Sequence, residues 1–309
     1  MHLFAGSSHP ALAKKLAQEL KIPLGKVLLK AFSCGERYVK YLESVRGKDV
    51  YILQTATLEP DVCLIELYLM CQAARLSFAK SVHVVFPHFA YARQDRVAEP
   101  REPISAKLIA HLLEESGADH VITLDLHSAQ IQGFFSIPVD SLDARPIFAH
   151  YFKSKNLANP VVVSPDAGGA KRAKKFADMI GADLAIMHKG RPQHQKAEII
   201  EVVGDIEGHT CILFDDMIDT GGSLVSAAQA LRKRGANANV YAAATHAIFS
   251  GNAIANLKAA KFKEVVVTDS VPVNKKAFPG LKILPIAPML AEVIRHIELG
   301  ESVTDIYKK

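Results

Sequence analysis

The chain has 309 residues and a mass of 33.6 kDa. At the usual domain size this predicts about two domains and excludes a small module held together by disulfides or metal. Hydrophobic residues make up 49% and charged residues 22% of the sequence, so long disordered segments are not expected. The 37 basic and 32 acidic residues leave a net charge of +5, which fits either nucleic acid or a phosphorylated small molecule as partner.

The cysteines and the amino terminus indicate the compartment. Cys34, Cys63, Cys71 and Cys211 form no Cys-x-x-Cys pair, and no Asn-x-Ser/Thr acceptor occurs, so neither a zinc ribbon nor a secreted glycoprotein is indicated. The first six residues lack the basic start and apolar stretch of a signal peptide, and no run of about 18 apolar residues could span a bilayer. We therefore expect a soluble, cytoplasmic protein that does not bind membranes.

Apolar runs of strand length alternate with amphipathic helical patterns along the chain. Most of the runs are continuous, as in strands that are buried on both faces. In chain order the predicted strands are 27–32, 50–53, 82–86, 121–124, 161–163, 184–187, 211–214, 240–244 and 265–267. The predicted helices are 11–20, 61–80, 104–115, 171–180, 223–234 and 290–298. This alternation predicts an α/β fold with doubly wound, mostly parallel sheets.

Residues 141–160 form a predicted linker near the midpoint, where Asn and Pro residues surround a short helical stretch. In each half a buried strand runs into an acidic loop, at 121–125 and at 211–215. The sequence therefore predicts two similar domains, with a boundary at about residues 143 and 144.

The segment 211–224 carries the strongest local motif, a buried strand that leads through a loop into a helix. Gly221 and Gly222 allow tight turns and close approach of a ligand. Main-chain N–H groups at the start of the following helix, with the Thr220 and Ser223 hydroxyls, can hold a phosphate dianion.

Acidic residues precede these phosphate-binding groups. Asp215, Asp216 and Asp219 do not bind phosphate, but they accept hydrogen bonds from sugar hydroxyls or help to hold a hydrated cation. The alternative is that Asp219 or Thr220 only caps the helix. Because open α/β sheets bind ligands at the carboxyl ends of their strands, a sugar phosphate is the favoured ligand.

The segment 215–223 resembles the ribose-phosphate-binding signature of type I phosphoribosyltransferases. Four further segments resemble the ribose-phosphate pyrophosphokinase family: 85–96, 101–107, 125–135 and 164–169. The resemblance extends from residue 5 to residue 303. It implies two domains of the type I phosphoribosyltransferase fold, 1–143 and 144–286, with the helix 287–299 packed on the first. It also implies transfer of the diphosphoryl group of ATP to the 1-hydroxyl of ribose 5-phosphate, with Mg²⁺ as cofactor.

Two segments are candidates for ATP binding. Arg93, Gln94, Asp95 and Arg96 follow a predicted strand and offer planar donors and an acceptor, which suit adenine and polyphosphate; the alternative is a solvated loop. The resemblance assigns ATP contacts to Arg93 and Gln94.

A second segment supplies the candidates Phe32, Cys34 and Glu36. Cys34 stands where the family usually has Asp or Asn, and a thiol is a weaker hydrogen-bonding group. Phe32 would stack on the base, although an aromatic residue at a strand end often belongs to the core.

The resemblance implies that His127 and Asp166 hold Mg²⁺, with Asp125 assisting through water. Since magnesium prefers oxygen ligands, His127 suits contact with phosphate better. It also implies that a loop closes over the reaction, in which Lys189 and Arg191 stabilise charge on the phosphates. In that loop Gly190 replaces an Arg and His188 replaces an Asp. A solvated hairpin tip is the alternative for this segment.

The family comparison further implies a homo-oligomer built from dimers, commonly a hexamer, and no nucleic-acid partner. Ser44, Arg46 and Arg101 match parts of the family's regulatory phosphate site. Two other functions stay open at this point. One is a salvage phosphoribosyltransferase that uses the same 215–223 segment, and the other is a non-catalytic regulatory homologue that binds ribose phosphates.

Overall fold

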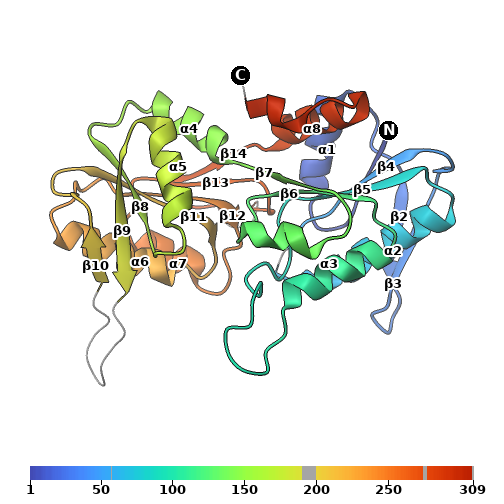
Figure 1. Ribbon diagram of the computed structural model, residues 1–309, viewed down its shortest axis with the longest axis horizontal. Helices are drawn as coiled ribbons and strands as arrows, with labels where there is room; N and C mark the ends of the chain where they lie inside the picture. Colours follow the sequence, from blue (N-terminus) through green and yellow to red (C-terminus); the bar gives the residue numbers. More distant parts are fainter. Residues whose placement is uncertain (57, 190–199, 274–276, 308–309) are drawn as a thin grey trace. The chain divides into compact units, whose positions relative to one another are not determined.

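The computed structural model describes residues 1–56, 58–189, 200–273 and 277–307. They divide into two compact units (Figure 1). Unit 1 comprises Met1–Asp143, Ser270–Pro272 and Pro285–Lys309, and unit 2 comprises Ala144–Asp269 and Val273–Leu284. Among these described ranges, no helix is both long and apolar enough to cross a membrane.

Unit 1 is built on a five-stranded parallel sheet with the strand order β1-β4-β5-β6-β7. The strands are β1 (His2–Ala5), β4 (Asp49–Leu53), β5 (Ser81–Phe86), β6 (His120–Leu124) and β7 (Val139–Leu142). Its helices are α1 (Pro10–Leu20), α2 (Pro60–Leu76), α3 (Ser105–Glu115) and α8 (Ala287–Leu299), and the short 3₁₀ helices η1 (Ala129–Phe134) and η2 (Val303–Tyr307) complete it.

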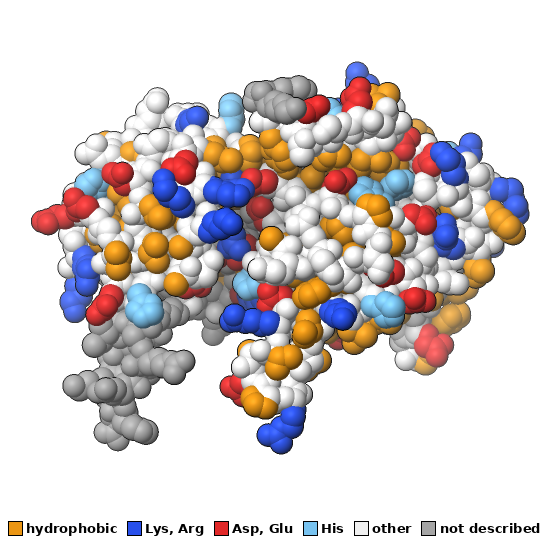
Figure 2. Space-filling model, in the orientation of Figure 1, with side chains coloured by type: hydrophobic (Ala, Val, Ile, Leu, Met, Phe, Trp, Pro, Cys, Tyr) orange, Lys and Arg blue, Asp and Glu red, His pale blue; other side chains and the backbone are white. Residues whose placement is uncertain are grey.

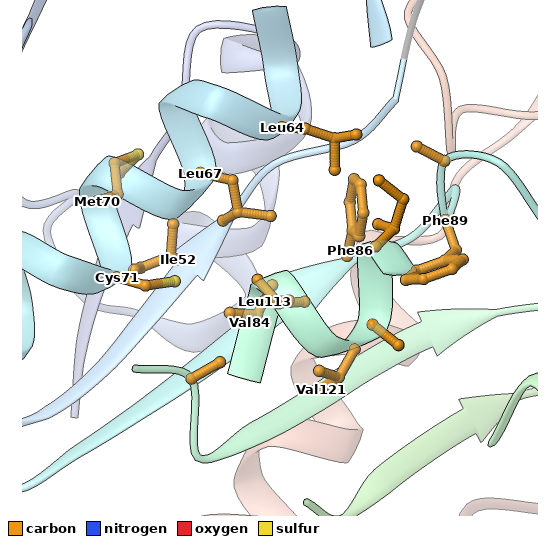
Figure 3. Packing of buried hydrophobic residues seen from close by; sticks show 14 of the residues in the cluster. Ile52, Leu64, Leu67, Met70, Cys71, Val84, Phe86, Phe89, Leu113 and Val121 are labelled. Carbon is orange, nitrogen blue, oxygen red and sulfur yellow. The ribbon is translucent and has the colours of Figure 1, made fainter. Parts of the chain in front are cut away.

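The main core of unit 1 lies between its sheet and the helices α2 and α3 (Figure 3). Leu67 of α2 and Leu113 of α3 pack with Val84 and Val121 of the central strands, and all four side chains are fully buried. Such continuous apolar strands are what a parallel sheet with two covered faces requires. The helix α8 belongs to the same unit, and the Tyr51 hydroxyl of β4 donates to Glu298 Oε1 of α8 at 3.0 Å.

The apolar run at 27–32 forms a strand, as the sequence predicted, but this strand belongs to an exposed hairpin and not to the main sheet of unit 1. β2 (Val27–Ala31) pairs antiparallel with β3 (Arg37–Tyr41) in a separate two-stranded sheet. Val27 and Leu29 pack against the core of unit 1, whereas Leu28 is 39% exposed. The apolar residue on the solvent side makes this half-buried strand resemble, in sequence, a strand buried on both faces.

Unit 2 contains a seven-stranded sheet with the order β10-β9-β8-β11-β12-β13-β14, in which β10 is antiparallel and the other strands are parallel. The strands are β8 (Pro160–Ser164), β9 (Asp183–Lys189), β10 (Ile200–Val203), β11 (Thr210–Ile218), β12 (Tyr241–Ala247), β13 (Val265–Thr268) and β14 (Leu281–Leu284). The helices are α4 (Arg145–Ser154), α5 (Ala170–Ile180), α6 (Gly222–Lys233) and α7 (Ala253–Ala259). The mostly parallel sheets that the sequence predicted are confirmed.

The predicted linker 141–160 is largely the packed helix α4. Phe148 of α4 meets Phe214 of β11 edge-on with ring centroids 5.5 Å apart, and Phe214 stacks on Phe176 of α5 at 4.3 Å. The short helical stretch predicted within this segment is α4, and the turn after it has Asn156 and Asn159 at positive φ. The aromatic residues, more than the surrounding Asn and Pro, determine the structure of this segment because they join the core of unit 2.

Candidate functional site

The carboxyl edge of the unit 2 sheet carries the acidic motif. Asp215 and Asp216 lie on β11 itself, whereas the sequence predicted that the strand ends at residue 214. β11 is longer because β12 continues to pair with it, with Asp215 opposite Ala244 and Met217 opposite His246. Both carboxyl groups therefore stand on a rigid strand and not on a loop.

The segment after β11, for which the sequence predicted phosphate binding, forms a largely exposed loop at the start of α6. Gly221 is the N-cap residue, with φ of 74°, and as a glycine it makes no side-chain cap hydrogen bond. The alternative that Asp219 or Thr220 caps α6 is therefore wrong. Thr220, Gly222 and Ser223 are exposed, so the first-turn amides and two hydroxyls can meet a ligand from solvent.

Ser250 and Asn256, which the sequence did not single out, hold this loop through hydrogen bonds. The Ser250 hydroxyl donates to Asp219 Oδ1, and the Ser250 N–H donates to the Asp219 carbonyl at 3.2 Å. Asn256 of α7 donates through Nδ2 to the Thr220 carbonyl at 2.8 Å. Asp219 thus anchors the loop through Ser250, and its link to a segment 31 residues further along the chain left no local signal.

Arg172 is the other residue that sequence reasoning missed. From the first turn of α5, its Nη1 donates to Asp215 Oδ1 and to Asp216 Oδ1, each at 3.1 Å. Burial and the neighbouring Asp216 carboxylate raise the pKa of Asp215 well above its usual range, and the Arg172 guanidinium counteracts part of this rise. The sequence shows Arg172 only as one of several basic residues on a helix.

Asp166 follows β8, the strand next to β11, so it lies at the same carboxyl edge as the acid pair. Its Oδ1 accepts a hydrogen bond from the Gly169 N–H at 2.8 Å, and its main-chain carbonyl accepts one from the Ser164 hydroxyl at 2.7 Å. A Cβ at Gly169 would lie 2.8 Å from Ser164 Oγ, so glycine is required for this tight turn into α5.

The other two predicted metal ligands belong to unit 1 and follow β6. Asp125 is half-buried with φ of 41°, and His127 is exposed. Over the ranges that the structure describes, no group of three or more His, Cys, Asp or Glu side chains is arranged to hold a metal ion. The described residues therefore do not form a preassembled metal site made of protein ligands alone.

The predicted ATP-binding residues lie on two exposed segments of unit 1. Phe32, Cys34 and Glu36 form the tip of the β2–β3 hairpin, where Phe32 is 46% exposed and therefore not a core residue. Its ring meets Tyr38 edge-on with centroids 5.7 Å apart, and Lys30 Nζ lies 5.4 Å from its centroid. This leaves an aromatic face beside a positive charge, as base stacking next to phosphates requires.

Arg93, Gln94, Asp95 and Arg96 lie in the loop between β5 and α3, and all but the half-buried Asp95 are exposed. Gln94 is held in place, since its Oε1 accepts from the Ser105 hydroxyl at 2.5 Å and its carbonyl accepts from the Ala106 N–H at 3.1 Å. Figure 1 draws this loop apart from the tip of the β2–β3 hairpin.

The predicted catalytic residues lie at or beyond residue 189, where one of the described ranges ends. Lys189 ends β9, but its side chain lies outside the described residues, as does all of Arg191.

Of the predicted regulatory residues, Ser44 and Arg46 line one cavity of about 580 Å³, which Val45, Leu76 and Ser77 also line. Arg101 is exposed on the β5–α3 loop with φ of 78° and does not line that cavity.

Comparisons with known proteins agree with these observations. Residues 1–117 match the family model of the N-terminal domain of ribose phosphate pyrophosphokinase, and residues 190–308 match that of the phosphoribosyl synthetase-associated domain. The ribose-phosphate pyrophosphokinase of Helicobacter hepaticus is 47% identical over 305 residues, which cover 99% of this chain and 98% of that protein. That of Bacillus caldolyticus is 46% identical over 309 residues, with 99% and 98% covered.

A solved structure gives the same result. The crystal structure of phosphoribosylpyrophosphate synthetase from Mycobacterium smegmatis is 42% identical in sequence, with a TM-score of 0.92 over 97% of this chain and 99% of that chain. The predicted type I phosphoribosyltransferase-like fold is therefore confirmed. Full-length identity above 40% and a matching fold together show that this chain belongs to the ribose-phosphate pyrophosphokinase family, whose members are diphosphoryl transferases.

Proposed function

We propose that this chain transfers the β,γ-diphosphoryl group of ATP to the 1-hydroxyl of ribose 5-phosphate, giving 5-phosphoribosyl 1-pyrophosphate and AMP. Family membership supports this reaction, and neither a salvage phosphoribosyltransferase nor a non-catalytic homologue is favoured. The observation that carries the proposal is the exposed amino terminus of α6, with glycine as its N-cap, one short turn after the strand that carries the acid pair.

Unit 2 provides hydrogen-bond donors for the phosphate of ribose 5-phosphate and acceptors for its hydroxyl groups. The 5-phosphate binds the amides of Gly221, Gly222 and Ser223 and the hydroxyls of Thr220 and Ser223, where the positive end of the helix dipole favours a dianion. Asp215 and Asp216 accept hydrogen bonds from ribose hydroxyls. Asp219 holds the loop through Ser250.

In unit 1, ATP contacts Arg93 and Gln94, with Asp95 and Arg96 beside them and Phe32, Cys34 and Glu36 at the base. Lys189 and Arg191 stabilise the charge that develops on the phosphates during transfer. Diphosphoryl transfer depends on in-line positioning and charge compensation more than on covalent help, so no protein nucleophile is needed.

The donor set of the predicted metal ligands fits Mg²⁺. In unit 2, Asp166 is an exposed carboxylate whose Oδ2 accepts no hydrogen bond from the described residues, and in unit 1 the half-buried Asp125 is also a carboxylate. Magnesium is usually held by one or two carboxylates together with waters and substrate phosphates, so no all-protein cage is required. When bound, the ion would neutralise phosphate charge, while His127 suits a phosphate oxygen better than the ion.

We also propose a homo-oligomer, with dimers that assemble to a hexamer. The helices α2 and α3 expose large apolar side chains: Ile65 (50%), Leu69 (37%), Leu76 (71%), Leu108 (55%) and Leu112 (40%). Such a surface favours contact with another protein surface. We propose that the nucleotide site combines the hairpin tip of one copy with the β5–α3 loop of another, two segments that Figure 1 draws apart within unit 1.

Replacing Leu108 and Leu112 together by glutamate is expected to dissociate this oligomer, because charges would have to be buried at the interface. Sedimentation velocity measures the outcome. The matched control is Leu299→Glu on α8, also an exposed leucine at 70%, which should leave the assembly unchanged. An unaltered sedimentation coefficient in the double variant would exclude this face as the interface.

The four cysteines are free thiols, as a reducing compartment favours, and we place the enzyme in the cytoplasm.

The function is tested by incubating the purified protein with ATP, Mg²⁺ and ribose 5-phosphate and measuring AMP. We expect AMP in equal amount to the pyrophosphorylated sugar. No AMP over a range of phosphate and metal concentrations would contradict catalysis and favour the regulatory alternative.

The raised pKa of Asp215 predicts that ribose 5-phosphate binding improves as the pH rises. A protonated carboxyl accepts hydrogen bonds poorly, so KM for ribose 5-phosphate should fall as the pH passes upward through the raised pKa, above the ordinary carboxyl range. The phosphate of the substrate itself titrates at about pH 6. The pH profile of KM for ribose 5-phosphate is therefore compared with that of Asp215→Asn, in which, of these two groups, only the substrate phosphate titrates. Parallel profiles in the two proteins would contradict the prediction.

A further inference from the structure

Arg172 differs from the other basic residues of α5 because its side chain is largely buried against β11. The helix carries Lys171, Lys174 and Lys175, which are exposed, and Figure 2 shows Lys and Arg side chains gathered over the region where Figure 1 draws α5. Arg172 alone among these four is turned inward, with its side chain 21% exposed, against the acid pair of β11. An arginine suits this position because its guanidinium stays charged and presents several donors at fixed angles.

The contact of Arg172 leaves one oxygen of Asp215 available. Asp215 Oδ1 accepts from Arg172 Nη1 at 3.1 Å and from the Asp216 N–H at 2.8 Å. The Asp216 carboxyl group also interacts with the Asp215 side chain, and the hydrogen bonds assigned to a particular oxygen all involve Oδ1. The Asp215 side chain is 27% exposed. Two donors on one oxygen hold the carboxyl group in a single orientation, so Oδ2 is available to a ligand without any rearrangement of the side chain.

Asp216 has a different role from its neighbour. Its side chain is only 3% exposed, so its charge needs a partner within the protein, and Arg172 Nη1 provides it. One cation therefore serves both a buried carboxylate and an accessible one. The position of that cation depends on the turn before α5, where Asp166 accepts from Gly169.

We propose that Arg172 is a positioning residue for the ribose site, which orients Asp215 so that Oδ2 accepts a hydrogen bond from a ribose hydroxyl. This rests on the proposed function, since it presumes that Asp215 binds the ribose. It assigns to Arg172 a role in selecting sugars that carry the hydroxyl over sugars that lack it. Arg172 itself touches neither the sugar nor the reacting phosphates.

The test compares Arg172→Gln and Arg172→Lys with the matched control Arg232→Gln. Arg232 lies in the same unit and donates to the carbonyls of Ala260 and Lys261, so its loss removes a structural arginine remote from the site. Arg172→Gln should raise KM for ribose 5-phosphate by about tenfold or more and leave KM for ATP within about twofold. Arg172→Lys should restore part of the loss, and Arg232→Gln should leave both KM values unchanged.

Two further measurements separate positioning from a general structural role. In Arg172→Gln, the preference in kcat/KM for ribose 5-phosphate over 2-deoxyribose 5-phosphate should decrease relative to that of the unmodified protein. In an Asp215→Ala background, Arg172→Gln should change KM for ribose 5-phosphate by less than about twofold, because the side chain that it orients is absent. Calorimetric binding of ribose 5-phosphate, without ATP, provides the same comparison independently of turnover.

Additive effects of the two substitutions, or an unchanged sugar preference in Arg172→Gln, would overturn the proposal. Equal losses in KM for ATP and for ribose 5-phosphate would also overturn it, since they indicate a general structural defect. Failure of the proposed function has a different signature, because the unmodified protein would then form no AMP from ribose 5-phosphate.

Discussion

Replacing Lys189 by alanine is expected to lower kcat by about 10²- to 10³-fold, the usual effect of removing one group that stabilises transition-state charge. KM for ribose 5-phosphate and for ATP should change little, because Lys189 acts on charge that develops only during transfer. Lys189 ends β9, next to the segment that carries Arg191. Steady-state kinetics with AMP as the measured product provides both parameters.

Lys174→Ala is the matched control for this substitution. Lys174 is an exposed lysine of α5 in the same unit, and its partner is Asp178, one turn further along the same helix. Its loss should leave kcat unchanged, because exposed ion pairs contribute little to structure. If Lys189→Ala retained full turnover, or lost activity through a higher KM only, Lys189 would have no role in the transition state.

Asp215→Ala is expected to raise KM for ribose 5-phosphate by about tenfold or more, since a hydrogen bond to a charged group is worth about 1.5–3 kcal/mol. KM for ATP should remain near its original value, because the ATP contacts are assigned to unit 1. The substitution also removes one of the two carboxylates that Arg172 contacts, while Asp216 still balances the charge of the guanidinium. The fold should therefore persist, as circular dichroism can verify.

Asp178→Ala provides the control, since Asp178 is an exposed aspartate of the same unit whose side chain pairs with Lys174. Its KM values should match those of the unmodified protein. An unchanged KM for ribose 5-phosphate in Asp215→Ala would place the sugar elsewhere, whatever the activity of the enzyme.

Local patterns were sufficient to predict the fold class and the glycine-containing turn that leads into α6. Strands buried on both faces need continuous apolar runs, and helices that cover them need an amphipathic pattern, so each element is visible in its own residues. The loop at 219–223 is equally local, because glycine at positive φ and the start of a helix are contiguous in sequence. The family motifs added the reaction on the same local basis.

Pairings between distant segments were decided only by the tertiary structure. β11 extends to Ile218 because β12 pairs with it, which moved Asp215 and Asp216 from a loop to a strand. Arg172 reaches Asp215 across 43 positions, and Asn256 reaches Thr220 across 36. Contacts between residues so far apart leave no periodicity or composition signal in the chain. The sequence by itself therefore determined which groups are candidates for binding the ribose phosphate, and the tertiary structure alone decided which residues contact those groups.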